Sequence, residues 1–227
     1  MVALMRIGLI SDVHANLPAL QAVLAAMGDV NQILCAGDLV GYYAEPNEVC
    51  SLIRDIGAVC IRGNHDAYVT AALVPNSDRR EDYRTDWTRE TLSEVNFRWL
   101  EALPTELSLS VDGLTIKMRH ASPWDEETYL YPDAKATGDV KLDRDEFLVV
   151  GHTHRPMVVQ AGEGLLINPG SVGQPRDYNP DASFAILDAQ ARCIVHRRVR
   201  YDVDAYQRRL KQLGWGEGPR LMLSRLR

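Results

Sequence analysis

Short apolar runs alternate with amphipathic stretches through the first sixty residues. Residues 7–10 are continuously apolar, which is typical of a strand buried on both faces. Apolar residues then recur at helical spacing over residues 18–28, between a proline and a glycine. The plan repeats as a strand over 32–35 and a helix over 46–57, and residues 58–61 form a third apolar run. This order predicts right-handed βαβ units in a parallel sheet.

A more polar segment, residues 67–104, follows the third strand. Its apolar residues predict a helix that flanks the ends of the strands: Leu92, Val95, Trp99 and Leu100. We interpret the segment as part of the same domain.

Strand patterns dominate the second half of the chain. The runs 107–111 and 114–118 enclose Asp112-Gly113, a strong hairpin signal. Further elements are predicted as strands over 147–150, 157–160, 165–167, 183–187 and 194–201, and a closing helix over 203–213. We expect mostly antiparallel strands here, and two sheets packed face to face with helices outside.

Composition places these elements in one domain, residues 1–227, with a C-terminal helix and tail over 202–227. The chain is 46% hydrophobic, enough for one sizeable core. Its net charge of −6 argues against stable nucleic-acid binding, although a small nucleotide could still bind at a local metal centre.

The cysteines and the N-terminus indicate a cytoplasmic protein. Four widely spaced cysteines are expected to be buried thiols of a reducing compartment: Cys35, Cys50, Cys60 and Cys193. No signal peptide precedes the first strand, and no apolar run is long enough to cross a membrane. A homo-oligomer remains open.

Polar clusters follow the predicted strands. They are Asp12-Val13-His14, Gly37-Asp38, Gly63-Asn64-His65-Asp66, His120 and Gly151-His152-Thr153-His154. Each alone has an ordinary explanation: a turn aspartate, a surface histidine or a Gly-Asn turn. Because ligand sites lie beyond the carboxyl ends of parallel strands, the clusters together predict a shared metal site.

Two pairs have a simple geometric interpretation. Strand alternation would send Asp12 and His14 to one side, where they could share a cation. An extended backbone would likewise turn His152 and His154 toward one pocket.

The complete series resembles the calcineurin-like metallophosphoesterases, in particular the branch of small bacterial phosphodiesterases and diadenosine tetraphosphatase-like proteins. The resemblance runs from Arg6 to about Tyr201. It implies an α/β (α+β) fold, a four-layer α/β/β/α sandwich of two mixed sheets with a dinuclear metal site at the sheet edge.

The resemblance also implies the roles of the polar residues. Seven metal ligands divide between two ions: Asp12, His14 and His154 on the first, Asn64, His120 and His152 on the second, and Asp38 on both. His65 is then the catalytic histidine and, when protonated, donates to the leaving oxygen or stabilises the phosphoryl charge. Two divalent ions and two carboxylates leave a charge near +2 for an anionic substrate. The donor set suits manganese, iron, nickel or zinc.

This implies a hydrolase that cleaves a small phosphodiester or nucleotide by attack of a metal-bridging hydroxide. A phosphomonoesterase or protein phosphatase is the enzymatic alternative, and a non-catalytic metal-binding scaffold is the alternative from another class.

For four residues near the motifs, the sequence allows both a functional and a structural role. Arg176, in a segment that also resembles this branch, could bind the substrate phosphate or form a structural ion pair. Asn16 could contact substrate or cap a helix, and Tyr42 could contact substrate or pack as an aromatic. Asp66 could orient His65 or cap a turn.

Overall fold

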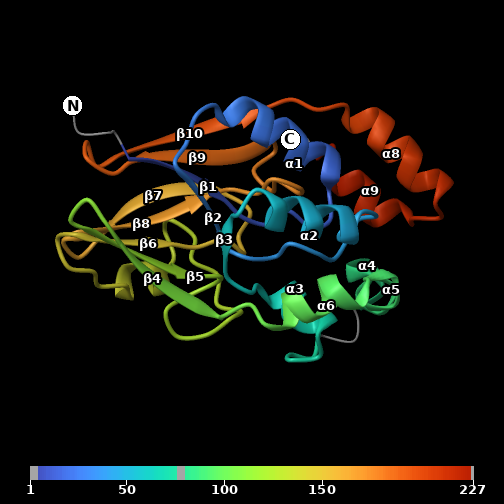
Figure 1. The fold of residues 1–227 in the computed structure, drawn as a ribbon, viewed down its shortest axis with the longest axis horizontal. Helices are drawn as coiled ribbons and strands as arrows, with labels where there is room; N and C mark the ends of the chain where they lie inside the picture. Colours follow the sequence, from blue (N-terminus) through green and yellow to red (C-terminus); the bar gives the residue numbers. More distant parts are fainter. Residues whose placement is uncertain (1–4, 76–79, 226–227) are drawn as a thin grey trace.

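The computed structural model, which describes residues 5–75 and 80–225, contains two five-stranded sheets packed face to face (Figure 1). The strand order is β10-β9-β1-β2-β3 in the first sheet and β4-β5-β6-β8-β7 in the second. Both sheets contain parallel and antiparallel pairs. The predicted sandwich of two mixed sheets is therefore confirmed.

The first sheet is formed by β1 (Arg6–Ile10), β2 (Gln32–Cys35), β3 (Val59–Cys60), β9 (Ala182–Asp188) and β10 (Cys193–Val199). β1, β2 and β3 are parallel, as the alternation of strands and helices predicts. Along β1, Ile7 and Leu9 face the second sheet, whereas Ile10 faces the helices. Burial on both faces explains why the run is continuously apolar.

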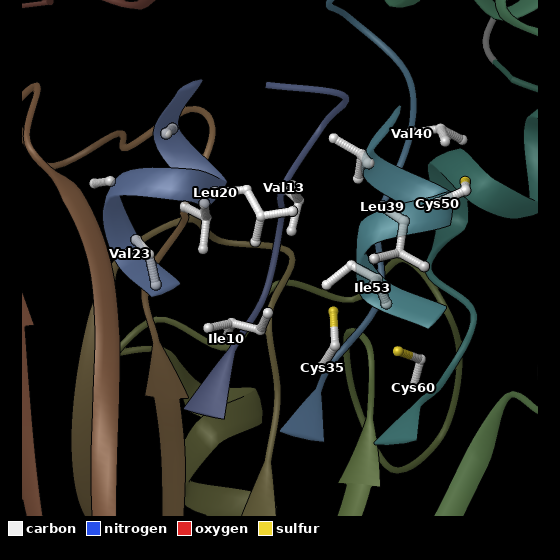
Figure 2. Close-up of a cluster of buried hydrophobic side chains, with 14 of the residues drawn as sticks. Ile10, Val13, Leu20, Val23, Cys35, Leu39, Val40, Cys50, Ile53 and Cys60 are labelled. Atoms are coloured by element: carbon white, nitrogen blue, oxygen red, sulfur yellow. The ribbon is translucent and has the colours of Figure 1, made fainter. Parts of the chain in front are cut away.

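Helices α1 (Leu17–Met27) and α2 (Pro46–Asp55) cover the outer face of the first sheet (Figure 1). Figure 2 shows their buried side chains, including Leu20 and Ile53, around the strand ends at Ile10 and Cys35. The predicted helix over 46–57 ends earlier than expected: Ile56 follows the last turn of α2 and is 38% exposed.

The second sheet comprises β4 (Glu106–Val111), β5 (Leu114–Arg119), β6 (Glu146–Val149), β7 (Pro156–Ala161) and β8 (Gly164–Pro169). The hairpin at Asp112-Gly113 is confirmed, with φ of 48° and 80° at the two turn residues. However, β5–β6 and β6–β8 are parallel pairs. The long connection 120–145, which contains α7 (Lys135–Asp139), carries the chain back to start β6 beside β5, and forms a thin fourth layer.

The segment 67–104 forms short helices instead of one long helix. They are α3 (Asn64–Val69), α4 (Arg80–Tyr83), α5 (Thr85–Thr91) and α6 (Glu94–Glu101), and residues 76–79 lie outside the described part. Leu92 and Leu100 are buried as expected, but Val95 is 64% exposed because it lies in the first turn of α6 on the solvent side.

The C-terminal part contains α8 (Val203–Gln212) and an additional helix, α9 (Glu217–Met222). Within residues 5–75 and 80–225, no helix is both long and apolar enough to cross a bilayer. Three cysteines are buried as predicted, but Cys193 is exposed because it begins the edge strand β10.

Candidate metal centre

The predicted polar residues converge where five strands end. Asp12, Asp38 and Asn64 follow β1, β2 and β3, and His120 and His152 follow β5 and β6. One ligand atom each from Asp12, His14, Asp38 and His154 lies within 4.8 Å of the others, and all four residues are buried. The second group is centred on Asn64, whose Oδ1 lies 3.0 Å from both His120 Nε2 and His152 Nδ1.

The backbone brings these side chains together by left-handed turns, not by extended alternation. The φ angles are positive at five of the residues: Asp12, His14, Asp38, His152 and His154. Such conformations are uncommon in residues other than glycine and are concentrated at functional sites. His152 and His154 consequently face different halves of the site, toward Asn64 and His14 respectively. The expectation of an extended backbone at both pairs is wrong.

Backbone carbonyl groups determine which nitrogen of each imidazole faces the site. The four contacts are His14 Nδ1 to Val40 O, His120 Nδ1 to Ala36 O, His154 Nδ1 to Gln174 O and His152 Nε2 to Glu127 O, at 2.6–3.2 Å. A carbonyl oxygen can only accept, so the facing nitrogen must carry the proton. The neutral ring therefore presents its other nitrogen, an acceptor, to the site.

Acceptors consequently face acceptors, and this arrangement fits a cation. The Nε2 atoms of His14 and His154 are 3.1 Å apart, and Asp38 Oδ2 lies 3.6 Å from His14 Nε2 and 3.3 Å from His120 Nε2. Asp12 Oδ2 is buried and has no hydrogen bond of normal geometry among the described residues, although the Ser11 hydroxyl lies beside the Asp12 carboxylate. Converging lone pairs of nitrogen and oxygen are the donors that divalent metals require.

The electrostatics of the site also favour positive charge. Burial raises the pKa of Asp38, but His120 and His65 outweigh it and hold that pKa well below its ordinary value. Burial opposes protonation of His120, yet the charge of Asp38 and a hydrogen bond to it raise the pKa of His120 to about 10. Burial lowers the pKa of His14 to about 4 and raises that of Asp12 to about 7. A proton on His120 thus supplies the charge that a metal would bring.

His65 lies apart from the converging acceptors, on the first turn of α3. Its backbone N–H donates to Asp38 Oδ1 at 2.8 Å, and its ring packs against Tyr42 and Tyr83 at centroid distances of 4.8 and 4.5 Å. Burial lowers the pKa of His65 well below its ordinary value, although Asp38 opposes the shift. The expectation of a protonated His65 is therefore not supported for the free site, where a neutral imidazole is favoured.

A cavity of about 500 Å³ opens over the site. Its lining includes residues of both groups together with four tyrosines: Asp38, Tyr42, Asn64, His65, Tyr68, Val74, Pro75, Tyr83, Glu127, Tyr129, His152, His154 and Arg176. Arg176 donates to Tyr42 Oη at 3.2 Å and to Gln174 Oε1 at 2.8 Å. In the described part of the chain, no carboxylate forms an ion pair with it. The alternative of a structural ion pair is thus not supported.

For Asn16 and Asp66, the structure supports the local structural role and not the functional one. Asn16 is wholly buried, caps α1 by accepting from Ala19 N, and donates to Gly173 O, so the helix cap holds and the substrate contact does not. Asp66 accepts from the backbone N–H groups of Asp38, Val40 and Gly63 at 2.9–3.1 Å. It ties the loops after β2 and β3 together instead of orienting His65.

Sequence reasoning missed Tyr68, Tyr83, Glu127 and Tyr129. Tyr83, Glu127 and Tyr129 lie outside the strand-end motifs, in a short helix or an irregular segment, and only the folded chain brings them to the cavity. The spacing of Tyr68 three positions after His65 was the one available signal, since a helix places both on one face.

The fold and the site together define a metal-binding phosphoesterase domain. Residues 5–192 match the model of the calcineurin-like phosphoesterase superfamily domain, and the chain belongs to this family. The family is metal-dependent, and the buried Asp/His cluster could bind a metal ion.

Individual relatives agree with this assignment. The chain is 35% identical to the uncharacterized protein MJ0912 of Methanocaldococcus jannaschii, over 96% of this chain and 98% of that protein. It is 26% identical to the phosphodiesterase YfcE of Escherichia coli K12, over 82% and 88% of the two chains. The crystal structure of a metallophosphoesterase from Sphaerobacter thermophilus superposes with a TM-score of 0.82 and 31% identity, covering 98% of this chain and 99% of that one.

Proposed function

We propose that this protein is a dinuclear metal-dependent phosphodiesterase acting on a small phosphodiester or nucleotide. The observation that carries the proposal is the convergence of imidazole, carboxylate and amide acceptors in two adjoining groups that share Asp38. Asp12, His14 and His154 would hold one divalent ion, Asn64, His120 and His152 the other. Such ions, of manganese, iron, nickel or zinc, supply Lewis acidity that lowers the pKa of water and polarises phosphoryl oxygens.

The remaining side chains act on the substrate. Arg176 lies in the cavity wall with its guanidinium held by Tyr42 and Gln174, and it binds a non-bridging phosphate oxygen. His65, whose ring packs against Tyr42 in the same cavity, donates from its neutral imidazole N–H to the phosphoryl or leaving oxygen. Both residues thereby stabilise charge that grows during in-line displacement.

The preference for a diester over a monoester rests on similarity to a named phosphodiesterase. Among the lining residues, the carboxylate of Glu127 and the guanidinium of Arg176 balance each other in charge. The two proposed ions would leave the site positive, which suits the anionic phosphate of either kind of ester.

A panel of model substrates tests the proposal. The protein loaded with Mn²⁺, Ni²⁺ or Zn²⁺ should hydrolyse bis(p-nitrophenyl) phosphate with a higher kcat/KM than p-nitrophenyl phosphate. Asp38→Ala should lose both metal and activity, because its carboxylate lies between the two groups. Preference for the monoester would favour the phosphatase alternative, and bound metal without turnover of either compound would favour the scaffold alternative.

A further inference from the structure

Glu127 contacts the Asn64 half of the site in two ways. It lies in a loop that Asp125 makes rigid, since Asp125 Oδ1 accepts from the backbone N–H groups of Glu127 and Thr128 at 2.9 and 2.6 Å. The backbone oxygen of Glu127 accepts from His152 Nε2 at 3.0 Å. This contact leaves Nδ1 of His152 as the acceptor that faces Asn64 Oδ1.

The side chain of Glu127 reaches Asn64 through Tyr68. The Tyr68 hydroxyl donates to Glu127 Oε1 at 2.5 Å, and donation from the side chain of Asn64 acts to lower the pKa of the Tyr68 hydroxyl. A carboxylate can only accept, so the hydroxyl proton points to Glu127 and its oxygen lone pair is left for the Asn64 amide nitrogen. The Glu127 carboxylate therefore determines the direction of both hydrogen bonds, from Tyr68 to Glu127 and from Asn64 to Tyr68. We call these two contacts the relay.

The relay matters because a primary amide can occupy its place in two orientations. With Oδ1 toward the site, Asn64 is a neutral oxygen ligand for a divalent ion. After a flip, Nδ2 would donate to the acceptor nitrogen of His152, and the metal position would be blocked. With Oδ1 inward, the amide oxygen faces the lone pair of His152 Nδ1, so a contact to Nδ2 on the far side of the amide is needed to favour this orientation.

We propose that Glu127 and Tyr68 are positioning residues for this metal ion: together they hold Asn64 Oδ1 and His152 Nδ1 toward it. The inference rests on the proposed dinuclear site and deepens it. Among the described residues, the hydrogen bonds and ion pairs of the other group, Asp12, His14 and His154, do not involve Tyr68 or Glu127. Loss of the hydrogen bonds through Tyr68 and Glu127 should thus weaken the binding of one metal ion and leave the binding of the other unchanged.

Tyr68→Phe is the sharpest test, because it removes one oxygen atom and leaves the ring in place. Titration of the metal-free protein with Mn²⁺ by calorimetry should give two sites in the wild type. In Tyr68→Phe, the affinity of one site should fall about 10- to 100-fold, the usual effect of losing a contact that orients a ligand. Electron paramagnetic resonance should then show isolated Mn²⁺ at concentrations that give a spin-coupled pair in the wild type.

Matched variants separate the relay from general destabilisation. Tyr206→Phe removes another tyrosine hydroxyl that donates to a glutamate, Glu45, at 2.5 Å, but in the cluster of α8. Glu126→Ala removes the neighbouring carboxylate, which faces Arg62 at 3.8 Å. Both controls should keep two sites of wild-type affinity, whereas Glu127→Ala should behave like Tyr68→Phe.

The outcomes distinguish the inference from the function on which it rests. Two wild-type sites with unchanged affinities in Tyr68→Phe and Glu127→Ala would overturn the relay and leave the dinuclear proposal standing. Equal weakening of both sites, or the same loss in Tyr206→Phe, would also overturn it. A single site in the wild type would overturn the dinuclear proposal, and the relay with it.

Discussion

At the scale of single residues, the chemistry depends on which atom of each side chain faces the site. Four backbone carbonyls select the nitrogen that each converging histidine presents, and Tyr68 selects the oxygen of Asn64. A sequence identifies a histidine or an asparagine but not the face that it turns to a ligand. The same residue types without carbonyl acceptors to fix the tautomer could turn an N–H toward the site, and such a donor would repel a cation.

Metal binding should release protons, because the metal ions displace protons that His120 and Asp12 hold in the metal-free protein. The pKa of about 10 means that His120 is protonated in the metal-free protein at pH 8, whereas Asp12, with a pKa of about 7, is mostly ionised there. We expect release of about one proton at pH 8 and more at pH 6, where Asp12 is also protonated. Calorimetric titration with Mn²⁺ in buffers of different ionisation enthalpy measures this number. Release that is absent at pH 8 would contradict the charge assigned to His120.

Replacing His65 should separate catalysis from metal binding. His65→Ala is expected to lower turnover of an aryl phosphodiester about 10²-fold or more, because it removes a donor from the cavity but no converging acceptor. Metal analysis should give wild-type content. His196→Ala is the matched control, since His196 is half-buried on β10 and contacts Asn168 O. Wild-type turnover in His65→Ala would remove this residue from the mechanism.

At the scale of elements, the loops after β2 and β3 interlock. A Cβ on Gly63 would overlap the Asp38 carboxylate, and a Cβ on Gly37 would lie 2.6 Å from Gly63 N. Asp66 bonds to backbone N–H groups of both loops. The position of the shared carboxylate therefore depends on two glycines in neighbouring loops.

Gly63→Ala should weaken metal binding and destabilise the fold together. The added methyl must displace Asp38, and overpacking of this kind costs about 1–3 kcal/mol. Gly138→Ala, in α7 with open space around its Cα, should leave both properties near wild type. Thermal unfolding and metal titration of the two variants provide the measurement. A Gly63→Ala protein with full metal affinity would show that the loops can separate without cost.

The sequence predicted elements where local pattern and packing agree. The apolar runs of β1 and β2 and the Asp112-Gly113 turn carry their own signals, and the structure contains each of them. The parallel pairing of β5, β6 and β8 has no such signal, because it depends on a long connection that crosses the sheet. Likewise, the positions of the predicted strand ends indicated which polar residues converge. The left-handed turns that direct their side chains into the site depend on tertiary packing and could not be predicted from the local sequence. Tyr68 and Glu127 meet only across the cavity.

At the scale of the whole molecule, the last thirty-five residues add to the region matched by the family model, which ends at residue 192. Helices α8 and α9 pack around the segment at Tyr42 and Tyr43, behind the cavity. Trp215 Nε1 donates to Tyr42 O at 2.6 Å and so supports its left-handed backbone, with φ of 63°. Tyr42 in turn accepts from Arg176. Trp215 thereby links the C-terminal helices to the cavity wall, beside the hydrogen bond from Tyr43 to Pro219 O.

Trp215→Ala should therefore change both stability and substrate binding. Trp215 is 5% exposed, and truncation of a buried tryptophan typically costs about 3–5 kcal/mol of unfolding free energy. Because Tyr42 and then Arg176 lose their support, we expect KM for an aryl phosphodiester to rise more than kcat falls, with metal content preserved. Trp124→Ala, at a tryptophan that is 53% exposed, should lower the melting temperature little. A Trp215→Ala protein that is less stable but keeps its KM would show that the C-terminal helices stabilise the fold without shaping the cavity.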